Sequence, residues 1–193
     1  MKVCFFDFET GGLQPHHPNT QLAGVVVDEN WNEVATYEAK IQFREEDADP
    51  KALEINHYSR ERWADAKPEA LVAAEFDRFL RDHATIRMVN REGKEYFLAR
   101  LAGHNILSFD MPRLRDMFAR HGRNWVPAHH HGLDTHQRAL WLAEEASVAF
   151  ESFKLTDCCK ALGVTVDIAH DALADCRLSA AVARAIRKFK EAA

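Results

Sequence analysis

The stretch FFDFET, residues 5–10, decides how this chain folds and what chemistry it can carry. Its aromatic residues favour a β-strand, yet it places two carboxylates, Asp7 and Glu9, one residue apart. Side chains on a strand alternate between its faces, so both carboxylates emerge on one face and the phenylalanine between them on the other. Two like charges this close in partly dry surroundings raise each other's pKa and cost free energy unless a proton or a cation lies between them. A divalent metal ion would resolve the conflict; the alternative is a frayed strand end where both acids face water.

The composition is that of an ordinary globular protein. Of the 193 residues, 47% are hydrophobic and 28% are charged, and neither a membrane-span-length apolar run nor a signal-type start is present. We therefore expect one domain, residues 1–193, in the cytoplasm and without a membrane partner. The formal net charge of −5 argues against a protein that coats long duplexes by charge alone, because that mode needs many basic residues along the phosphates. It does not argue against an enzyme that grips a few nucleotides at one end.

Two further groups of potential metal or disulfide ligands are interpreted as structural. The run HHH at 129–131 has no acids or cysteines at ligand spacing and is expected to be a solvated loop. The cysteines form no C-x-x-C pair, and the adjacent two suit neither a disulfide framework nor a zinc site. They are expected to be reduced and mostly structural: Cys4, Cys158, Cys159 and Cys176.

The apolar patterns predict an α/β chain. Strands come first, at 2–8, 21–28 and 33–41, and form an antiparallel meander. A hairpin that turns at NREGKE is expected over 85–103, with its second arm returning to the core. Short helical pieces are expected over 50–66, and clear helices over 68–82, 111–122, 134–146, 153–162 and 172–190. This order indicates a sheet covered by helices.

Three residues far along the chain join the opening pair of acids. Asp110 stands at a strand-to-helix junction, so its carboxylate can emerge at a sheet edge. Asp175 lies three residues before Leu178, on the apolar stripe that the last helix is expected to turn toward the sheet. His170 precedes the expected helix start at Asp171 and can lean over the same site.

Four such carboxylates would form an all-oxygen cage that suits Mg²⁺ or Mn²⁺ better than zinc or copper. Two ions roughly 3.5 to 4 Å apart can stabilise the attacking and the leaving oxygen of a displacement at phosphorus, so the cage indicates phosphoryl chemistry. The attacking water needs a base that titrates near neutrality, and histidine has an unperturbed pKa of about 6.5. His170 is that candidate.

The segments DFET, HNILSFD and HDALAD together resemble the three motifs of the DEDDh (DnaQ-like) superfamily of 3′ to 5′ exonucleases, in the same order over residues 7–175. The resemblance implies an α/β, ribonuclease-H-like fold with a mixed five-stranded sheet and helices on both faces. It also implies two Mg²⁺ or Mn²⁺ ions and a histidine base. Position by position, the metal-binding acids would be Asp7, Glu9, Asp110 and Asp175, and the base His170.

The spacing of the second motif refines the resemblance. Three residues separate Asn105 from Phe109 and a proline follows, which is closer to the TREX-type enzymes than to the polymerase proofreading subunit. The implied activity is hydrolysis at single-stranded 3′ ends, chiefly of DNA, with release of nucleoside 5′-monophosphates. A ribonuclease that trims RNA or tRNA ends and a non-catalytic nucleic-acid-binding module are the alternatives. A homodimer and association with a polymerase stay open.

Several single residues have two interpretations. By resemblance, Thr10 would contact the terminal nucleotide, but it could equally be a turn threonine. Leu13 could wedge beside a terminal base, although a buried loop leucine is favoured. Asn105 could bind substrate or brace its loop. His104 is expected to be structural, and Asp134 is expected to cap a helix.

Overall fold

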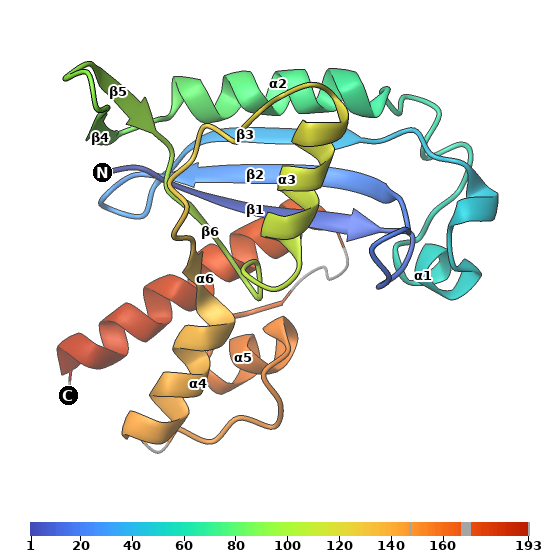
Figure 1. The fold of residues 1–193 in the computed structure, drawn as a ribbon. Helices are drawn as coiled ribbons and strands as arrows, with labels where there is room; N and C mark the ends of the chain where they lie inside the picture. Colours follow the sequence, from blue (N-terminus) through green and yellow to red (C-terminus); the bar gives the residue numbers. More distant parts are fainter. Residues whose placement is uncertain (147, 167–170, 193) are drawn as a thin grey trace.

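A five-stranded mixed β-sheet lies at the centre of the protein (Figure 1). The structure is a computed structural model that describes residues 1–146, 148–166 and 171–192, with 189–192 described by their backbone alone. The strands lie in the order β3-β2-β1-β6-β7; β1, β2 and β3 are antiparallel neighbours, and β6 and β7 run parallel to β1. Their bounds are β1 Val3–Thr10, β2 Asn19–Val27, β3 Glu33–Lys40, β6 Leu101–Gly103 and β7 Leu133–Asp134. The predicted meander is confirmed.

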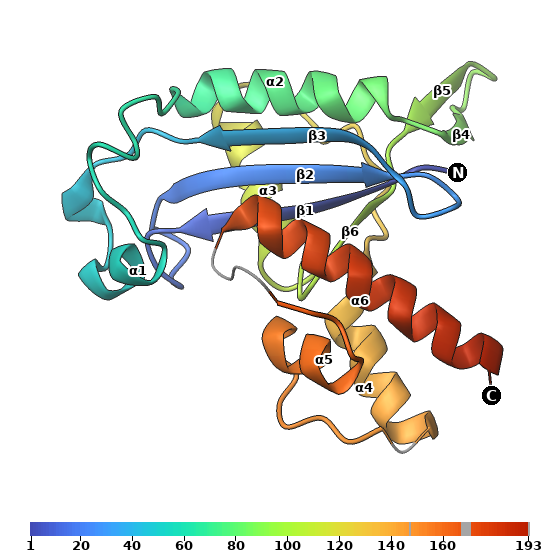
Figure 2. The same ribbon diagram turned by 180° about the vertical axis from the view of Figure 1, so that it is seen from behind.

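Helices cover both faces of this sheet. Figure 1 shows α3 crossing one face with α2 along β3, and Figure 2 shows α6 crossing the opposite face. The five clear helices differ from their predicted bounds by at most two residues at either end, whereas only α1 and a 3₁₀ turn form before them. Within the described part of the chain, no helix combines the length and apolar character that a membrane span needs. The bounds are η1 Glu45–Asp47, α1 Pro50–Ile55, α2 Glu69–Asp82, α3 Asp110–Arg120, α4 Thr135–Ala146, α5 Leu155–Ala161 and α6 Ala172–Ala192.

The alternation of side chains along β1 divides the interior into two cores. Phe6 and Phe8 are buried against α2 and α3. Phe5 faces the other way and packs with residues of α6. Asp7 and Glu9 share the face of Phe5, so the strand directs both carboxylates toward the α6 side of the sheet.

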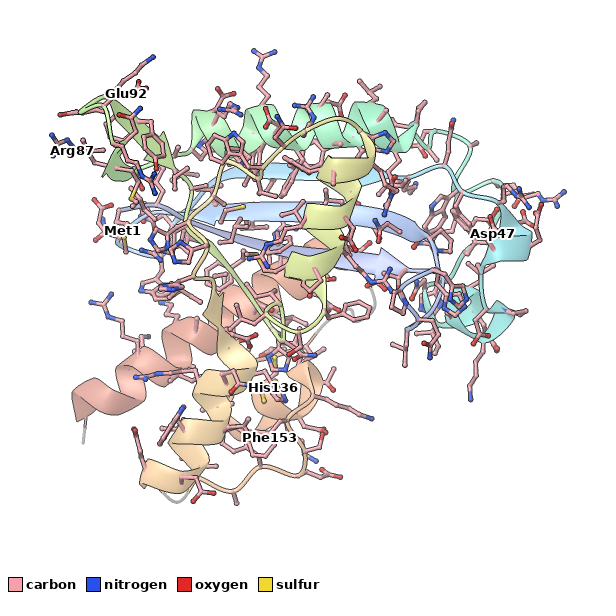
Figure 3. All side chains as sticks on the ribbon, viewed as in Figure 1. Met1, Asp47, Arg87, Glu92, His136 and Phe153 are labelled. Atoms are coloured by element: carbon pink, nitrogen blue, oxygen red, sulfur yellow. The ribbon has the colours of Figure 1, made fainter. Side chains whose placement is uncertain are left out.

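Helix α6 is buried on two sides. Of the predicted stripe Leu178, Val182, Ile186 and Phe189, the first three are buried, but they pack against α4 and α5 rather than against the sheet, which corrects the prediction. Small residues, Cys176 and Ala180, face the sheet and permit its close approach. Figure 3 places His136 and Phe153 in the α4–α5 layer below the sheet. All four cysteines are free and buried, as predicted.

The predicted hairpin over 85–103 forms only in part. Strands β4 (Ile86–Val89) and β5 (Glu95–Leu98) pair with each other as a separate two-stranded sheet, which carries Arg87 and Glu92 away from the body (Figure 3). The rest of the second arm, Leu101–Gly103, becomes β6 beside β1. Leu101 and Ala102 are fully buried there, whereas most of β5 is exposed, so burial of apolar residues explains why the arm divides.

Candidate active site

The open edge of β1 fixes the position of Asp110. Strand β6 pairs only with the first half of β1, at Cys4 and Phe5, and the chain turns away from β1 after Gly103. A Cβ at Gly103 would lie 2.8 Å from Phe6 O, so the turn needs glycine. Beyond this point the Phe8 N–H donates not to a strand but to Asp110 Oδ1, at 3.0 Å. Asp110 is the first residue of α3 and is 3% exposed. The carboxylate therefore satisfies a backbone donor between the two acids of β1.

The first turn of α6 supplies another acid. Carboxylate oxygens of Asp7, Glu9 and Asp175 lie within 4.8 Å of one another, the only such group of three or more metal-ligating side chains among the residues that the structure describes. Asp175 lies between the two buried sides of α6, the one that packs on the sheet and the one that packs on α4 and α5. The helix can therefore direct it at the end of β1.

A fifth acid, which the sequence marked only as a helix start, borders this group. The Asp171 side chain caps α6, because its Oδ1 accepts from the Ala174 N–H at 3.1 Å. Its Oδ2 accepts from Gln21 Nε2 at 3.3 Å. Gln21 lies opposite Glu9 on β2, so Asp171 is tied to the strand beside the site. Its charge raises the pKa of both Asp7 and Glu9.

Burial and mutual repulsion raise the pKa of the clustered acids. Desolvation, followed by the charges of Asp110 and Glu9, holds the pKa of Asp7 well above its usual range. Desolvation, followed by the charge of Asp175, raises the pKa of Glu9 to about 8. Burial raises the pKa of Asp110 to about 7, although its hydrogen bonds oppose the shift. Without a cation, burial and repulsion thus favour the protonated forms of these carboxyls.

The donor set fits a hard divalent cation. Asp7, Glu9 and Asp175 offer oxygen ligands only, which suits Mg²⁺ or Mn²⁺, and their repulsion is what a cation would relieve. Asp110, the fourth predicted ligand, lies next to this group rather than within it. The run at 129–131 lies outside the helices and strands, and His130 and His131 are exposed; that it binds no metal stays a prediction. The predicted base, His170, lies outside the described residues, so its role stays a prediction.

The loop after β1 carries two of the predicted substrate contacts. The Thr10 hydroxyl donates to Gly12 O at 2.9 Å, which supports the interpretation as a turn threonine. Leu13 is 82% exposed, so the favoured interpretation as a buried leucine is wrong. The loop turns its backbone inward, and Gly11 and Gly12 are buried where side chains would collide. Contact of Thr10 or Leu13 with a nucleotide stays a prediction.

Asp134 braces the loop that leads to Asp110. Its Oδ1 accepts from the Asn105 N–H at 3.0 Å and the His136 N–H at 2.9 Å, and its Oδ2 accepts from the Leu107 N–H at 3.1 Å. It thus caps α4, as predicted, and also holds the 104–109 loop. Asn105 has φ +61° and shapes this loop through its backbone. His104 bonds Thr135 Oγ1 and Phe153 O at 2.9 and 2.8 Å, in agreement with a structural role.

Sequence reasoning did not find Arg113. It lies one helical turn after Asp110 and is 8% exposed, and its guanidinium bonds backbone carbonyls of the loop after β1. In the sequence FDMPRL, the spacing of apolar residues does not distinguish a buried arginine from one that faces solvent. Only the folded position of the loop reveals its partners.

The fold is ribonuclease-H-like, and three acids gather at the end of its first strand. The family model described as exonuclease matches residues 4–183, so the chain belongs to the exonuclease family. The predicted superfamily and fold are thereby confirmed. A comparison with curated proteins gives no match.

Solved structures share this fold. E. coli exonuclease I in complex with a dT13 oligonucleotide superposes with a TM-score of 0.75 and 21% identity, over 98% of this chain and 43% of that chain. A structure of exonuclease I described for its processivity superposes with a TM-score of 0.75 and 21% identity, over 97% of this chain and 41% of that chain. A 3′-exonuclease that recognises the histone mRNA stem-loop superposes with a TM-score of 0.71 and 15% identity, over 98% of this chain and 64% of that chain. The chain thus spans about two fifths of exonuclease I.

Proposed function

We propose that this protein is a metal-dependent 3′ to 5′ exonuclease that removes nucleotides from single-stranded 3′ ends, chiefly of DNA, and releases nucleoside 5′-monophosphates. The observation that carries the proposal is the convergence of Asp7, Glu9 and Asp175 within 4.8 Å in a chain of the exonuclease family. The complexes of exonuclease I with dT13 and dA16 support a single-stranded DNA substrate.

The acids act together in this proposal. Asp7, Glu9 and Asp175 would hold two Mg²⁺ or Mn²⁺ ions, with Asp110 beside them. Bound ions of this kind stabilise the charges on the attacking and the leaving oxygen at phosphorus. The zinc-bound exonuclease I complex supports a divalent cation in this fold, while the choice of Mg²⁺ or Mn²⁺ depends on the all-oxygen donor set.

His170 would act as the general base that accepts a proton from the attacking water. A neutral imidazole is suited to this step near pH 7. The acids cannot easily replace it, because a carboxylate that binds a cation has lost much of its basicity. Asp110, the fourth predicted metal-binding acid, would also hold the start of α3 against β1 through its bond to the Phe8 N–H.

RNA ends are the second candidate substrate. The observation in favour is the structural match to the 3′-exonuclease that recognises the histone mRNA stem-loop. DNA and RNA differ at the 2′-hydroxyl, so a competition between matched oligomers separates the two. A non-catalytic nucleic-acid-binding module, the third candidate, would bind metal without turnover.

The test uses 5′-labelled single-stranded DNA and RNA oligomers of one sequence, with Mg²⁺, Mn²⁺ or EDTA. We expect a ladder that shortens from the 3′ end, nucleoside 5′-monophosphate products and no reaction in EDTA. Asp7→Asn should be inactive, whereas Asp116→Asn, at an exposed position on α3, should match the wild type. Intact oligomers in both metals, with folded protein, would contradict the proposal.

A further inference from the structure

The loop of residues 11–18 joins β1 to β2 directly after the acid cluster, and its base is firmly held. The Gly11 N–H donates to Pro18 O at 2.8 Å, which closes the loop. From outside, the Asp49 N–H donates to Gly11 O at 2.7 Å. Asn56, which is 7% exposed, donates its Nδ2 to Thr10 O at 2.9 Å. The start of the loop is therefore fixed relative to β1.

The turn of the loop accepts only glycine at its second position. Gly12 has φ +147°, a conformation that L side chains rarely adopt. A Cβ on Gly12 would lie 2.0 Å from His17 Nδ1. The same His17 nitrogen accepts from the Gln14 N–H at 3.3 Å, so the two arms of the loop pack directly on each other.

Arg113 binds the inner side of this loop. Its NH2 nitrogen donates to Gly12 O at 3.1 Å and to Gln14 O at 3.0 Å, and its NH1 nitrogen donates to His17 O at 3.1 Å. The guanidinium also lies 4.6 Å from the centre of the Phe109 ring. A planar fork of donors can reach several carbonyls at once, which a lysine ammonium on a flexible stem cannot reproduce.

The first turn of α3 thus controls two parts of the site. Asp110 binds the Phe8 N–H between the acids of β1, and Arg113, three residues later, binds the loop that follows the same strand. The loop in turn exposes an apolar tip, since Leu13 is 82% exposed. A leucine held in place on a fixed backbone can contact a ligand with little loss of conformational freedom.

We propose that Arg113 is a positioning residue for substrate: it fixes the 11–18 loop so that Leu13 meets the terminal nucleotide in a preformed position. This inference rests on the proposed exonuclease function. Within the described part of the chain, the side-chain hydrogen bonds of Arg113 all go to the loop and to Asn19 Oδ1, while only its charge reaches Asp110, so its main contribution lies in binding. Its loss raises KM and leaves kcat nearly unchanged.

The experiment compares four variants with the wild type. Arg113→Met removes the fork, Arg113→Lys keeps the charge without the fork, and Gly12→Ala disturbs the loop from its other side. Arg115→Met is the matched control, an exposed arginine of the same helix. Two readouts are made: steady-state KM and kcat on a single-stranded oligomer, and hydrogen exchange of the amides of residues 11–18.

Arg113→Met should raise KM roughly tenfold or more, with kcat within about threefold of the wild type. Exchange at Gly11, Gln14 and His17 should accelerate, and Gly12→Ala should reproduce both effects. Arg113→Lys should resemble Arg113→Met, and Arg115→Met should resemble the wild type.

The readouts separate the possible failures. Faster exchange with unchanged KM would make Arg113 merely structural and overturn the proposal. Unchanged exchange, full rescue by Arg113→Lys, or a fall in kcat alone would also overturn it. If Arg113→Met fails to fold, an unchanged KM in Gly12→Ala with a loosened loop overturns it in the same way. An inactive but folded wild type would instead overturn the exonuclease function itself, and this inference with it.

Discussion

The metal-free protein should lose stability as the pH rises, and Glu9→Gln should remove much of that loss. The folded state raises the pKa of Glu9 from 4.5 to about 8 through burial and neighbouring charge. Between these values the folded protein binds a proton that the unfolded chain has released, so the free energy of unfolding falls as pH rises from about 4.5 to 8. The raised pKa of Asp7 acts in the same direction.

The size of the effect follows from the shift. Each pKa unit corresponds to about 1.4 kcal/mol, so Glu9 alone contributes a loss of at most about 5 kcal/mol across this pH range. Relaxation of the site and entry of water reduce this value. Saturating Mg²⁺ or Mn²⁺ should restore stability at pH 8 through binding to the folded state only.

The assay is urea unfolding in EDTA at several values between pH 5 and pH 8. The difference between wild type and Glu9→Gln should grow with pH in favour of the variant, and Glu144→Gln, at an exposed position on α4, should follow the wild type. The variant should also respond less to added metal. A difference that stays constant with pH, or a variant that is less stable than the wild type at pH 8, would refute the reasoning.

Three further predictions concern single residues. Asp175→Asn should leave the circular dichroism spectrum unchanged and lower the rate of oligonucleotide hydrolysis by orders of magnitude; near-normal turnover would remove Asp175 from the site. His170→Ala should lower kcat by about 10² to 10⁴, the usual contribution of general-base catalysis, in single-turnover measurements, and an unchanged rate would assign the base elsewhere. Asp134→Ala should lower the free energy of unfolding by about 1–3 kcal/mol in urea, because the backbone N–H groups of Asn105, Leu107 and His136 lose their acceptor; an unchanged midpoint would show that water replaces it.

Periodicity predicted the parts of this fold that depend on local pattern. The alternation in FFDFET gave Asp7 and Glu9 a common face, because strand geometry alone decides it. The meander and the five clear helices follow from apolar spacing and helix-end residues in the same way.

Features that depend on packing between distant segments were not accessible in this way. The stripe of α6 was visible, but the sequence could not show that Leu178 meets α4 and α5 while the smaller Cys176 meets the sheet. A leucine such as Leu13 is expected in the core. Its exposure is explained only by the loop, whose glycine backbone is buried and leaves the Leu13 side chain outside. Arg113 and Asp171 have polar partners far away in the sequence, which no local pattern encodes.

The most direct test of the account is whether the gathered acids hold divalent cations. A crystal soaked in Mn²⁺ should give anomalous scattering peaks within about 2.0–2.6 Å of carboxylate oxygens of Asp7, Glu9 and Asp175. The same soak of Asp7→Asn crystals should give weaker peaks or none. A wild-type map with these carboxylates in place and no Mn²⁺ peak among them would contradict the account.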